Sequence, residues 1–189
     1  MEHAQSIVWR QLDETGLEYA KLVAIDNEWY LTGSVVVVQD TMPCELRYRV
    51  VIDERWHAVS ADIRGTLGLQ PVTIQIANDP QLGWAMNGGL CAGLDACIDI
   101  DLSFSPVTNT LPIRRLGLTI GESADVSVAW LRFPEMALER MDQRYTRTGE
   151  LTYRFESGSG TFVRELTVNA DGLVVSYPGL WERVADRAE

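Results

Sequence analysis

Histidine is scarce in this chain, and this scarcity argues against several kinds of catalytic and metal-binding site. His3 and His57 are the only histidines among 189 residues. The sequence has no HxxxH pair, no Cys/His ligand spacing, no GxSxG elbow and no Walker loop. A triad hydrolase would need His57 and a distant serine that no pattern identifies, and a zinc site would need ligands that the chain lacks. We therefore expect neither a metal site nor a cofactor.

Positive charge is also scarce. The chain has 16 Lys and Arg against 27 Asp and Glu, a formal net charge of -11, and Lys21 is its single lysine. Nucleic acids and anionic membrane surfaces attract cations, so this balance argues against both as partners. The three cysteines are an odd number without CxxC spacing, which is typical of reduced thiols and not of a disulfide framework.

Long apolar runs are missing as well. The longest β-branched run, Val35 to Val38, is far shorter than the roughly 18 residues of a membrane span, so we expect no stable membrane insertion. The first residues include neither the basic segment nor the apolar segment of a secretory signal. We therefore expect the protein in the cytoplasm.

The chain does contain short runs of apolar and polar residues that alternate with period two, separated by Gly, Pro, Asn and Asp. These runs predict strands at residues 6–12, 18–25, 28–39, 44–52, 56–64, 72–77, 124–133, 143–155 (interrupted at Gly149), 161–168, 173–177 and 180–184. Residues 78–93 predict a short strand followed by a mobile loop, and residues 134–142 fit either a short helix or a strand. With about a dozen strands and little helical periodicity, we expect a mainly β domain over residues 1–189, a single curled antiparallel sheet.

The stretch from Asp95 to Leu116, DACIDIDLSFSPVTNTLPIRRL, contains more polar and charged residues than a buried strand requires. Asp99, Asp101 and Ser103 alternate there with four apolar residues. Because side chains on a strand alternate faces, two carboxylates and a hydroxyl would line one side while the apolar groups bury the other. The stretch therefore predicts an acidic strand with one polar face.

A polar turn and two cations follow that strand. After Pro106 and the hydrogen-bonding residues 108–110, the chain reaches Arg114 and Arg115, which we expect on a basic strand that folds back onto the acidic one. Adjacent strand residues point to opposite faces, so only one of these arginines can meet the aspartates directly. The paired carboxylates could do acid–base work on a glycoside, hydrogen-bond sugar hydroxyls, or belong to a structural ion-pair network that fixes the turn.

Other polar and aromatic side chains add candidates. Arg47 and Arg49 share one strand face, and Tyr145 lies in a second polar row. Such rows would grip a phosphate or carboxylate head group if they faced a cavity, and would be solvated if they faced outward. Six tryptophans supply ring faces that stack on sugars or fill a core. Trp84 lies in the Gly-rich region, and we expect it to be exposed or lid-like.

Three parts of the chain together resemble one known family: residues 99–103 (DIDLS) with 105–116 (SPVTNTLPIRRL), residues 143–147 (QRYTR) and residues 171–180 (DGLVVSYPGL). In this order and spacing they look like the bacterial family named "Putative glycolipid-binding", formerly a domain of unknown function, over residues 9–183. The resemblance implies a spiral β-roll, in which a long antiparallel sheet wraps around a central cavity. That shape is similar to the bacterial lipoprotein carriers and glycolipid-carrying lipoproteins, which are exported, whereas this chain shows no export signal.

The expected function is non-catalytic binding of an amphipathic ligand, such as a glycolipid, in the cavity of the roll. Two alternatives stay open: an enzyme of glycolipid or glycoside metabolism that uses Asp99 and Asp101, and an interaction protein whose roll is packed solid. The resemblance supplies no catalytic residue, and the oligomeric state is left open. The candidate ligand-binding residues are Arg47, Arg49, Trp84, Asp99, Asp101, Asn109, Arg114 and Tyr145.

Overall fold

The computed structural model describes residues 4–188, so His3 lies outside the described residues. Its fifteen strands form one sheet in the order β8-β7-β6-β5-β4-β3-β2-β1-β15-β14-β13-β12-β11-β10-β9. Neighbouring strands are antiparallel, apart from the parallel pair β9 and β10. A mainly β protein with one mostly antiparallel sheet is thereby confirmed, while the curling of that sheet into a spiral roll stays a prediction.

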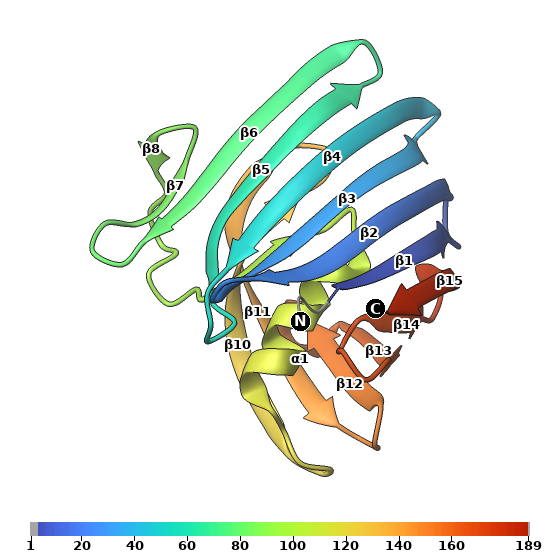
Figure 1. Cartoon of the computed structure of the whole chain (residues 1–189). Coiled ribbons are helices and arrows are strands. Elements are labelled where there is room, and N and C mark those ends of the chain that lie inside the picture. Colours follow the sequence, from blue (N-terminus) through green and yellow to red (C-terminus); the bar gives the residue numbers. More distant parts are fainter. Residues whose placement is uncertain (1–3, 189) are drawn as a thin grey trace.

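The first half of the sheet is a series of antiparallel hairpins with long strands (Figure 1). Its strands are β1 (Ala4–Gln11), β2 (Thr15–Ile25), β3 (Glu28–Gln39), β4 (Met42–Ile52), β5 (Ala58–Leu67), β6 (Gln70–Asp79), β7 (Gly83–Met86) and β8 (Gly89–Leu90). Burial alternates along these strands as the period-two pattern predicts, most regularly in β2 and β4. Residues 78–93 hold two short strands where one was expected.

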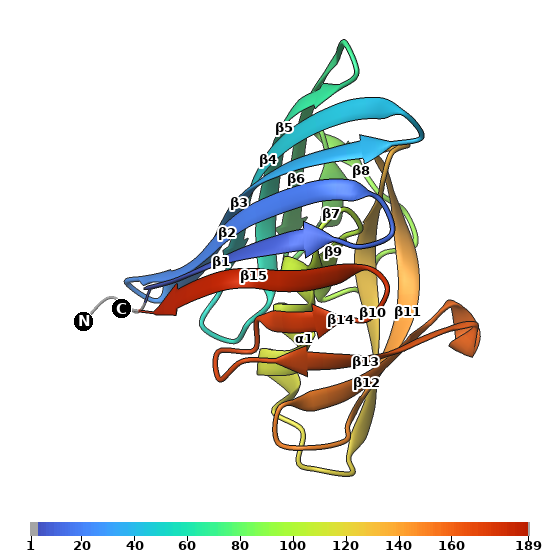
Figure 2. The same cartoon turned by 90° about the vertical axis from the view of Figure 1, so that its right-hand side faces the viewer.

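Within residues 4–188, the helical structure lies in the second half of the chain. Its elements are β9 (Asp99–Leu102), the 3-10 helix η1 (Pro106–Asn109), α1 (Thr110–Leu116), β10 (Ser123–Arg132), β11 (Ala137–Arg147), β12 (Thr152–Ser157), the 3-10 helix η2 (Gly158–Gly160), β13 (Phe162–Val168), β14 (Val174–Tyr177) and β15 (Trp181–Ala188). The undecided residues 134–142 thus belong mostly to a strand. β15 pairs with β1, which joins the two halves into one sheet (Figure 2).

The expected basic strand is wrong, because Arg114 and Arg115 lie in α1. Ser105 caps η1 by accepting the Val107 N–H, and Pro106 occupies the first helical turn, where its missing N–H costs nothing. Gly117 then ends α1 in the left-handed conformation. Both arginines sit in the last turn, where the helix dipole favours cations.

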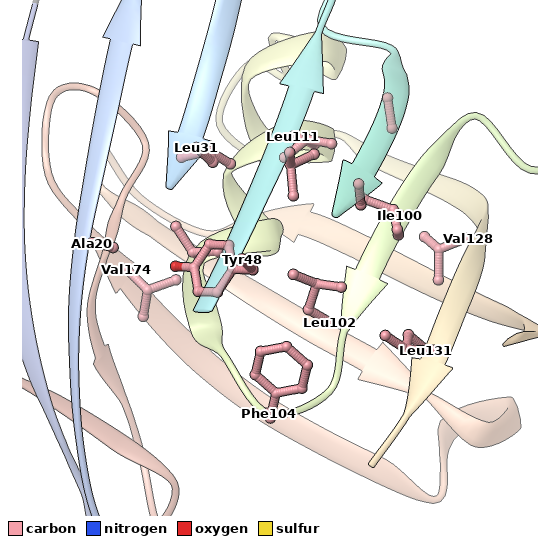
Figure 3. Close-up of a cluster of buried hydrophobic side chains, with 14 of the residues drawn as sticks. Ala20, Leu31, Tyr48, Ile100, Leu102, Phe104, Leu111, Val128, Leu131 and Val174 are labelled. Atoms are coloured by element: carbon pink, nitrogen blue, oxygen red, sulfur yellow. The ribbon is translucent and has the colours of Figure 1, made fainter. Parts of the chain in front are cut away.

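The interior of the protein is filled by side chains from both halves of the sheet and from α1. Figures 1 and 2 place α1 on the inner side of the sheet. Figure 3 shows the resulting cluster, in which Leu111 of α1 lies among Leu31, Tyr48, Leu102 and others. In the part of the chain that the structure describes, none of the helices has the length and apolarity to cross a membrane.

Candidate functional site

The candidate site begins at β9, which pairs with β10 so that Asp101 lies directly beside Trp130. Asp99 and Asp101 share one strand face, as the alternation predicts, and the intervening Ile100 is buried on the other. The two carboxylates nevertheless have different partners.

Asp99 forms a buried ion pair with Arg115 of α1. Asp99 is fully buried, and Arg115 Nε and Nη2 donate to its two carboxylate oxygens at 3.2 and 2.5 Å. Burial raises the pKa of Asp99, and the adjacent guanidinium opposes that rise. Of the two arginines, only Arg115 contacts Asp99 or Asp101 among the described residues, and the two side chains diverge on a helix and not on a strand. This pair fastens β9 to α1, the structural role that was one of the open interpretations of Asp99.

Asp101 belongs to a chain of buried polar groups. Gln143 Nε2 donates to Asp101 Oδ2 at 2.6 Å, and Gln143 Oε1 accepts from the Tyr145 hydroxyl at 3.3 Å. The Tyr145 oxygen in turn accepts from Asn109 Nδ2 at 2.8 Å. Burial raises the pKa of Asp101 to about 6 against the lowering effect of the Gln143 hydrogen bond. The structure therefore joins three candidates, Asp101, Asn109 and Tyr145, through Gln143, which was not among the candidate ligand-binding residues.

A cavity of about 190 Å³ opens beside Asp101. Its lining residues come from β9, η1 and strands β10–β15: Asp101, Ser103, Ser105, Pro106, Asn109, Trp130, Met141, Phe155, Ser157, Phe162, Tyr177, Leu180 and Trp181. The rings of Phe155, Phe162 and Tyr177 contact one another, with centroids 6.1 to 6.3 Å apart. The cavity is thus lined by a carboxylate, by serine hydroxyls and by several aromatic rings.

A larger cavity of about 490 Å³ lies along the exposed side of β10 and β11. Its charged side chains are already paired: Arg144 bonds Asp125 and Arg140 bonds Asp142, each at 2.9 Å. Exposed pairs of this kind are common on solvated surfaces and contribute little. The chemistry of the smaller cavity is therefore the more specific of the two.

Glu18 of β2 is a second buried carboxyl group, and it was not a candidate. It is 1 % exposed, and its Oε1 accepts hydrogen bonds from the Tyr48 hydroxyl at 2.5 Å and from Ser105 Oγ at 2.6 Å. Its Oε2 has no hydrogen-bond partner among residues 4–188. Burial raises the pKa of Glu18 to about 8, so the carboxyl group is mostly protonated at neutral pH. Ser105 connects this group to the cavity that it lines.

Gly33 makes the contact between Tyr48 and Glu18 possible. Tyr48 lies directly opposite Gly33 on the neighbouring strand, and its ring occupies the space that a Cβ at Gly33 would need. A glycine inside a strand indicates either a bulge or the close approach of another group, and at Gly33 it is the close approach. The sequence did carry a signal for Glu18. This charged residue lies on the buried face of β2, between Gly16 and Ala20.

Arg47 and Arg49 lie outside the cavity, on the exposed face of β4. Arg47 pairs with Glu45 at 2.8 Å, and the Arg49 guanidinium lies 4.6 Å from the centroid of the Tyr30 ring. The structure thus places them in the solvated position that was the alternative to a cavity wall.

Arg114 also lies away from the cavity. Its guanidinium is 4.5 Å from the ring centroid of Trp56 and 5.5 Å from that of Trp29, and it lies 3.9 Å from a carboxylate oxygen of Asp171. These contacts hold α1 against the β14 side of the sheet and the turn before β5.

The expectation that Trp84 is exposed or lid-like is wrong. Trp84 is 2 % exposed, and its Nε1 donates to the Cys97 carbonyl oxygen at 2.9 Å. The glycines around it form the turns of a hairpin that returns onto β6 and carries the ring into the core. Among residues 4–188, His, Cys, Asp and Glu side chains form no group of three or more that could hold a metal ion.

Comparisons with known proteins agree with this architecture. The family model described as "Putative glycolipid-binding" matches residues 6–183. A crystal structure of a DUF1089 family protein from Pseudomonas aeruginosa, PA1994, is 30% identical in sequence and superposes with a TM-score of 0.78. The similarity covers 88% of this chain and 92% of that one. No curated protein matches the chain. The chain belongs to the "Putative glycolipid-binding" family, DUF1089.

Proposed function

We propose that this protein binds an amphipathic ligand of the glycolipid type, with the polar head group in the cavity beside Asp101. The observation that carries the proposal is the composition of this cavity, which is lined by a carboxylate, by serine hydroxyls and by an aromatic wall of Phe155, Phe162 and Tyr177. Small-molecule sites are typically lined by apolar and aromatic side chains with a few placed polar groups. The family's description as glycolipid-binding is consistent with this chemistry.

The size of the cavity supports a head-group site. Its volume of about 190 Å³ is below the roughly 300–1,000 Å³ of sites that enclose a drug-sized ligand. A lipid head group fits such a volume, but an acyl chain in addition to it does not. The chain of a bound lipid must therefore lie on another surface.

A second, apolar cavity of about 460 Å³ supplies such a surface at the ends of β1, β2 and β3. Leu17 and Val36 line it, and these two residues lie opposite each other on β2 and β3. Gln11 also lines it and is paired across the sheet with Trp181, which lines the head-group cavity. Leu17 and Val36 are 55 % and 59 % exposed, so the apolar cavity lies on the solvent-facing side of the sheet, whereas Trp181 is buried. We propose that the acyl chain leaves the head-group cavity and lies along this apolar surface.

The carboxylates favour binding over glycoside hydrolysis. A hydrolase of the two-carboxylate type needs both groups beside the scissile bond. Asp101 lines the cavity, whereas both oxygens of Asp99 are engaged by Arg115. The arrangement supports one carboxylate that contacts a ligand and one that holds the fold.

Native mass spectrometry of protein purified from its own host tests the proposal. We expect a co-purifying lipid that is displaced by octyl β-glucoside. The substitution Phe162→Ala, which shortens the aromatic wall, should reduce retention of the lipid. Leu69→Ala should not, because Leu69 is 95 % exposed at a distant turn. A wild-type protein that carries no lipid and does not respond to octyl β-glucoside would contradict the proposal.

A further inference from the structure

The head-group cavity has a definite electrostatic character. Asp101 is its one charged lining residue among residues 4–188, and no arginine or lysine lines it. The cavity therefore offers an anion no opposite charge and confronts it with a carboxylate. Recognition of phosphate and carboxylate groups in proteins generally depends on arginine or on helix N-termini. The helix N-terminus that lines this cavity is that of η1, where Pro106 has no N–H and the Val107 N–H is already bonded to Ser105 Oγ.

Two arginines on the strands that border the cavity are committed elsewhere. Arg164 donates to the carbonyl oxygens of Pro178 and Val163 at 3.0 and 2.8 Å, while Arg132 pairs with Glu135 and Glu139 at 3.5 and 3.6 Å. Turning either arginine into the cavity would break these interactions. In this arrangement neither of these two arginines supplies the cavity with a positive charge.

Two residues that line the cavity each have a hydrogen-bonding atom without a protein partner. The bond from Gln143 uses Oδ2 of Asp101, and Oδ1 accepts nothing from residues 4–188. The half-buried Trp130 lines the same cavity, and its indole N–H has no acceptor within the described residues. Asp101 and Trp130 are direct neighbours across β9 and β10. An unpartnered acceptor and an unpartnered donor therefore belong to residues that are neighbours in the sheet and that line the same cavity.

We infer that the head group this cavity takes is an uncharged sugar ring, and that Asp101 and Trp130 determine this specificity; the inference rests on the proposed function. A sugar hydroxyl both donates and accepts, so it can satisfy Oδ1 of Asp101 and the N–H of Trp130. The apolar faces of the ring match the aromatic wall. Hydrogen bonds to a charged carboxylate are stronger than neutral ones, which makes Asp101 the principal contact.

Two other head groups fit less well. A phosphate only accepts hydrogen bonds when fully ionised, and it would meet the Asp101 carboxylate as a like charge. A quaternary ammonium would be attracted by the carboxylate and the aromatic rings, but it would leave the Trp130 N–H without a partner. The unpartnered donor and acceptor on two neighbouring residues are the feature that favours a hydroxyl-bearing ring over both.

The test compares three ligands with the same tail: octyl β-glucoside, octyl phosphate and octyltrimethylammonium, each below its critical micelle concentration at pH 7.5. Heteronuclear NMR follows the indole N–H resonance of Trp130, assigned with the variant Trp130→Phe, and gives a Kd for each ligand. We expect the wild-type protein to bind the glucoside at least about tenfold more tightly than either charged ligand. Equal or tighter binding of the phosphate or the ammonium would overturn the inference, while the binding of an amphipathic ligand in this cavity would stand.

The variants separate specificity from loss of folding. Asp101→Asn should weaken glucoside binding by about tenfold and leave phosphate binding equal or tighter, because the like charge is removed. Trp130→Phe keeps a ring and should weaken glucoside binding several-fold, as followed by the indole N–H of Trp181, which lines the same cavity. Asp125→Asn, on the exposed side of the same β10, should change none of the three affinities. An unchanged glucoside-to-phosphate ratio in Asp101→Asn would refute the assignment of Asp101. Binding of none of the three ligands to the wild-type protein would overturn the proposed function and this inference together.

Discussion

Replacing Glu18 by glutamine should change how the free energy of unfolding depends on pH. In the folded protein, burial raises the pKa of Glu18 from 4.5 to about 8. Between these two values the unfolded chain has lost a proton that the folded protein retains, so a rise in pH favours unfolding. The stability that Glu18 contributes is therefore fully present below pH 4.5 and is lost as the pH rises toward 8.

The size of the effect follows from the pKa difference. Each pH unit within that window is worth about 1.36 kcal/mol, so the wild-type protein should lose up to about 4 kcal/mol between pH 5 and pH 8 through this one group. Glutamine does not titrate, and its carbonyl oxygen can still accept the hydroxyls of Tyr48 and Ser105. Burial also raises the pKa values of Asp99 and Asp101, but both residues are present in both proteins and cancel in the comparison.

Urea unfolding monitored by tryptophan fluorescence at pH 5, 6, 7 and 8 measures this effect. Relative to its value at pH 5, the free energy of unfolding of Glu18→Gln should exceed that of the wild-type protein by up to about 4 kcal/mol at pH 8. Any cost of the unpaired amide is the same at each pH and does not alter this slope. The control Glu14→Gln, at an exposed turn, should follow the wild-type curve. A difference between Glu18→Gln and wild type that stays constant with pH would refute the reasoning.

Three further predictions concern the fold and the ligand. Arg115→Met leaves the buried Asp99 carboxylate without a partner and should lower the free energy of unfolding in urea by about 3–5 kcal/mol. The double variant with Asp99→Asn should recover much of that loss. A loss below about 1 kcal/mol would show that the pair does not fasten α1. Gly33→Ala should lower the free energy of unfolding by about 1–3 kcal/mol, because the new Cβ displaces the Tyr48 ring. Adding Tyr48→Ala should remove the clash. If the losses of the two single variants simply add in the double variant, this explanation is contradicted. Decyl β-glucoside should bind about tenfold more tightly than octyl β-glucoside, at about 0.8 kcal/mol for each added CH₂ that is buried; equal affinities would mean that the chain does not reach the apolar cavity.

Local sequence pattern predicted most of the sheet. The alternation in β2 and β4 recurs as alternating burial, because a side chain's face depends on the strand period alone. The same argument placed Asp99 and Asp101 on one face of β9. The argument failed at Arg114 and Arg115, where the strand-like alternation was assumed to continue beyond Pro106 although the chain forms a helix there. Ser105, Pro106 and Gly117 are helix cap signals that a reading for strands passes over.

The candidate site was only partly predictable. Asp101, Asn109 and Tyr145 were candidates because each is a polar residue in a particular stretch, and the structure connects them through Gln143. The exposure of Trp84 was predicted wrongly because glycines around a residue say that the chain turns there, but do not say which side of the turn faces the core.

By itself the sequence determined the strand content, the shared face of Asp99 and Asp101, and the lack of metal-binding and triad motifs, because these depend on residue type and on neighbours along the chain. The tertiary structure decided which carboxylate is paired and which is open. Arg115 reaches Asp99 from a helix, and aromatic residues up to 80 positions away from Asp101, such as Trp181, complete its cavity. The physical reason is that desolvation and hydrogen bonding depend on distances in space, and strand order, which pairs β1 with β15, sets those distances.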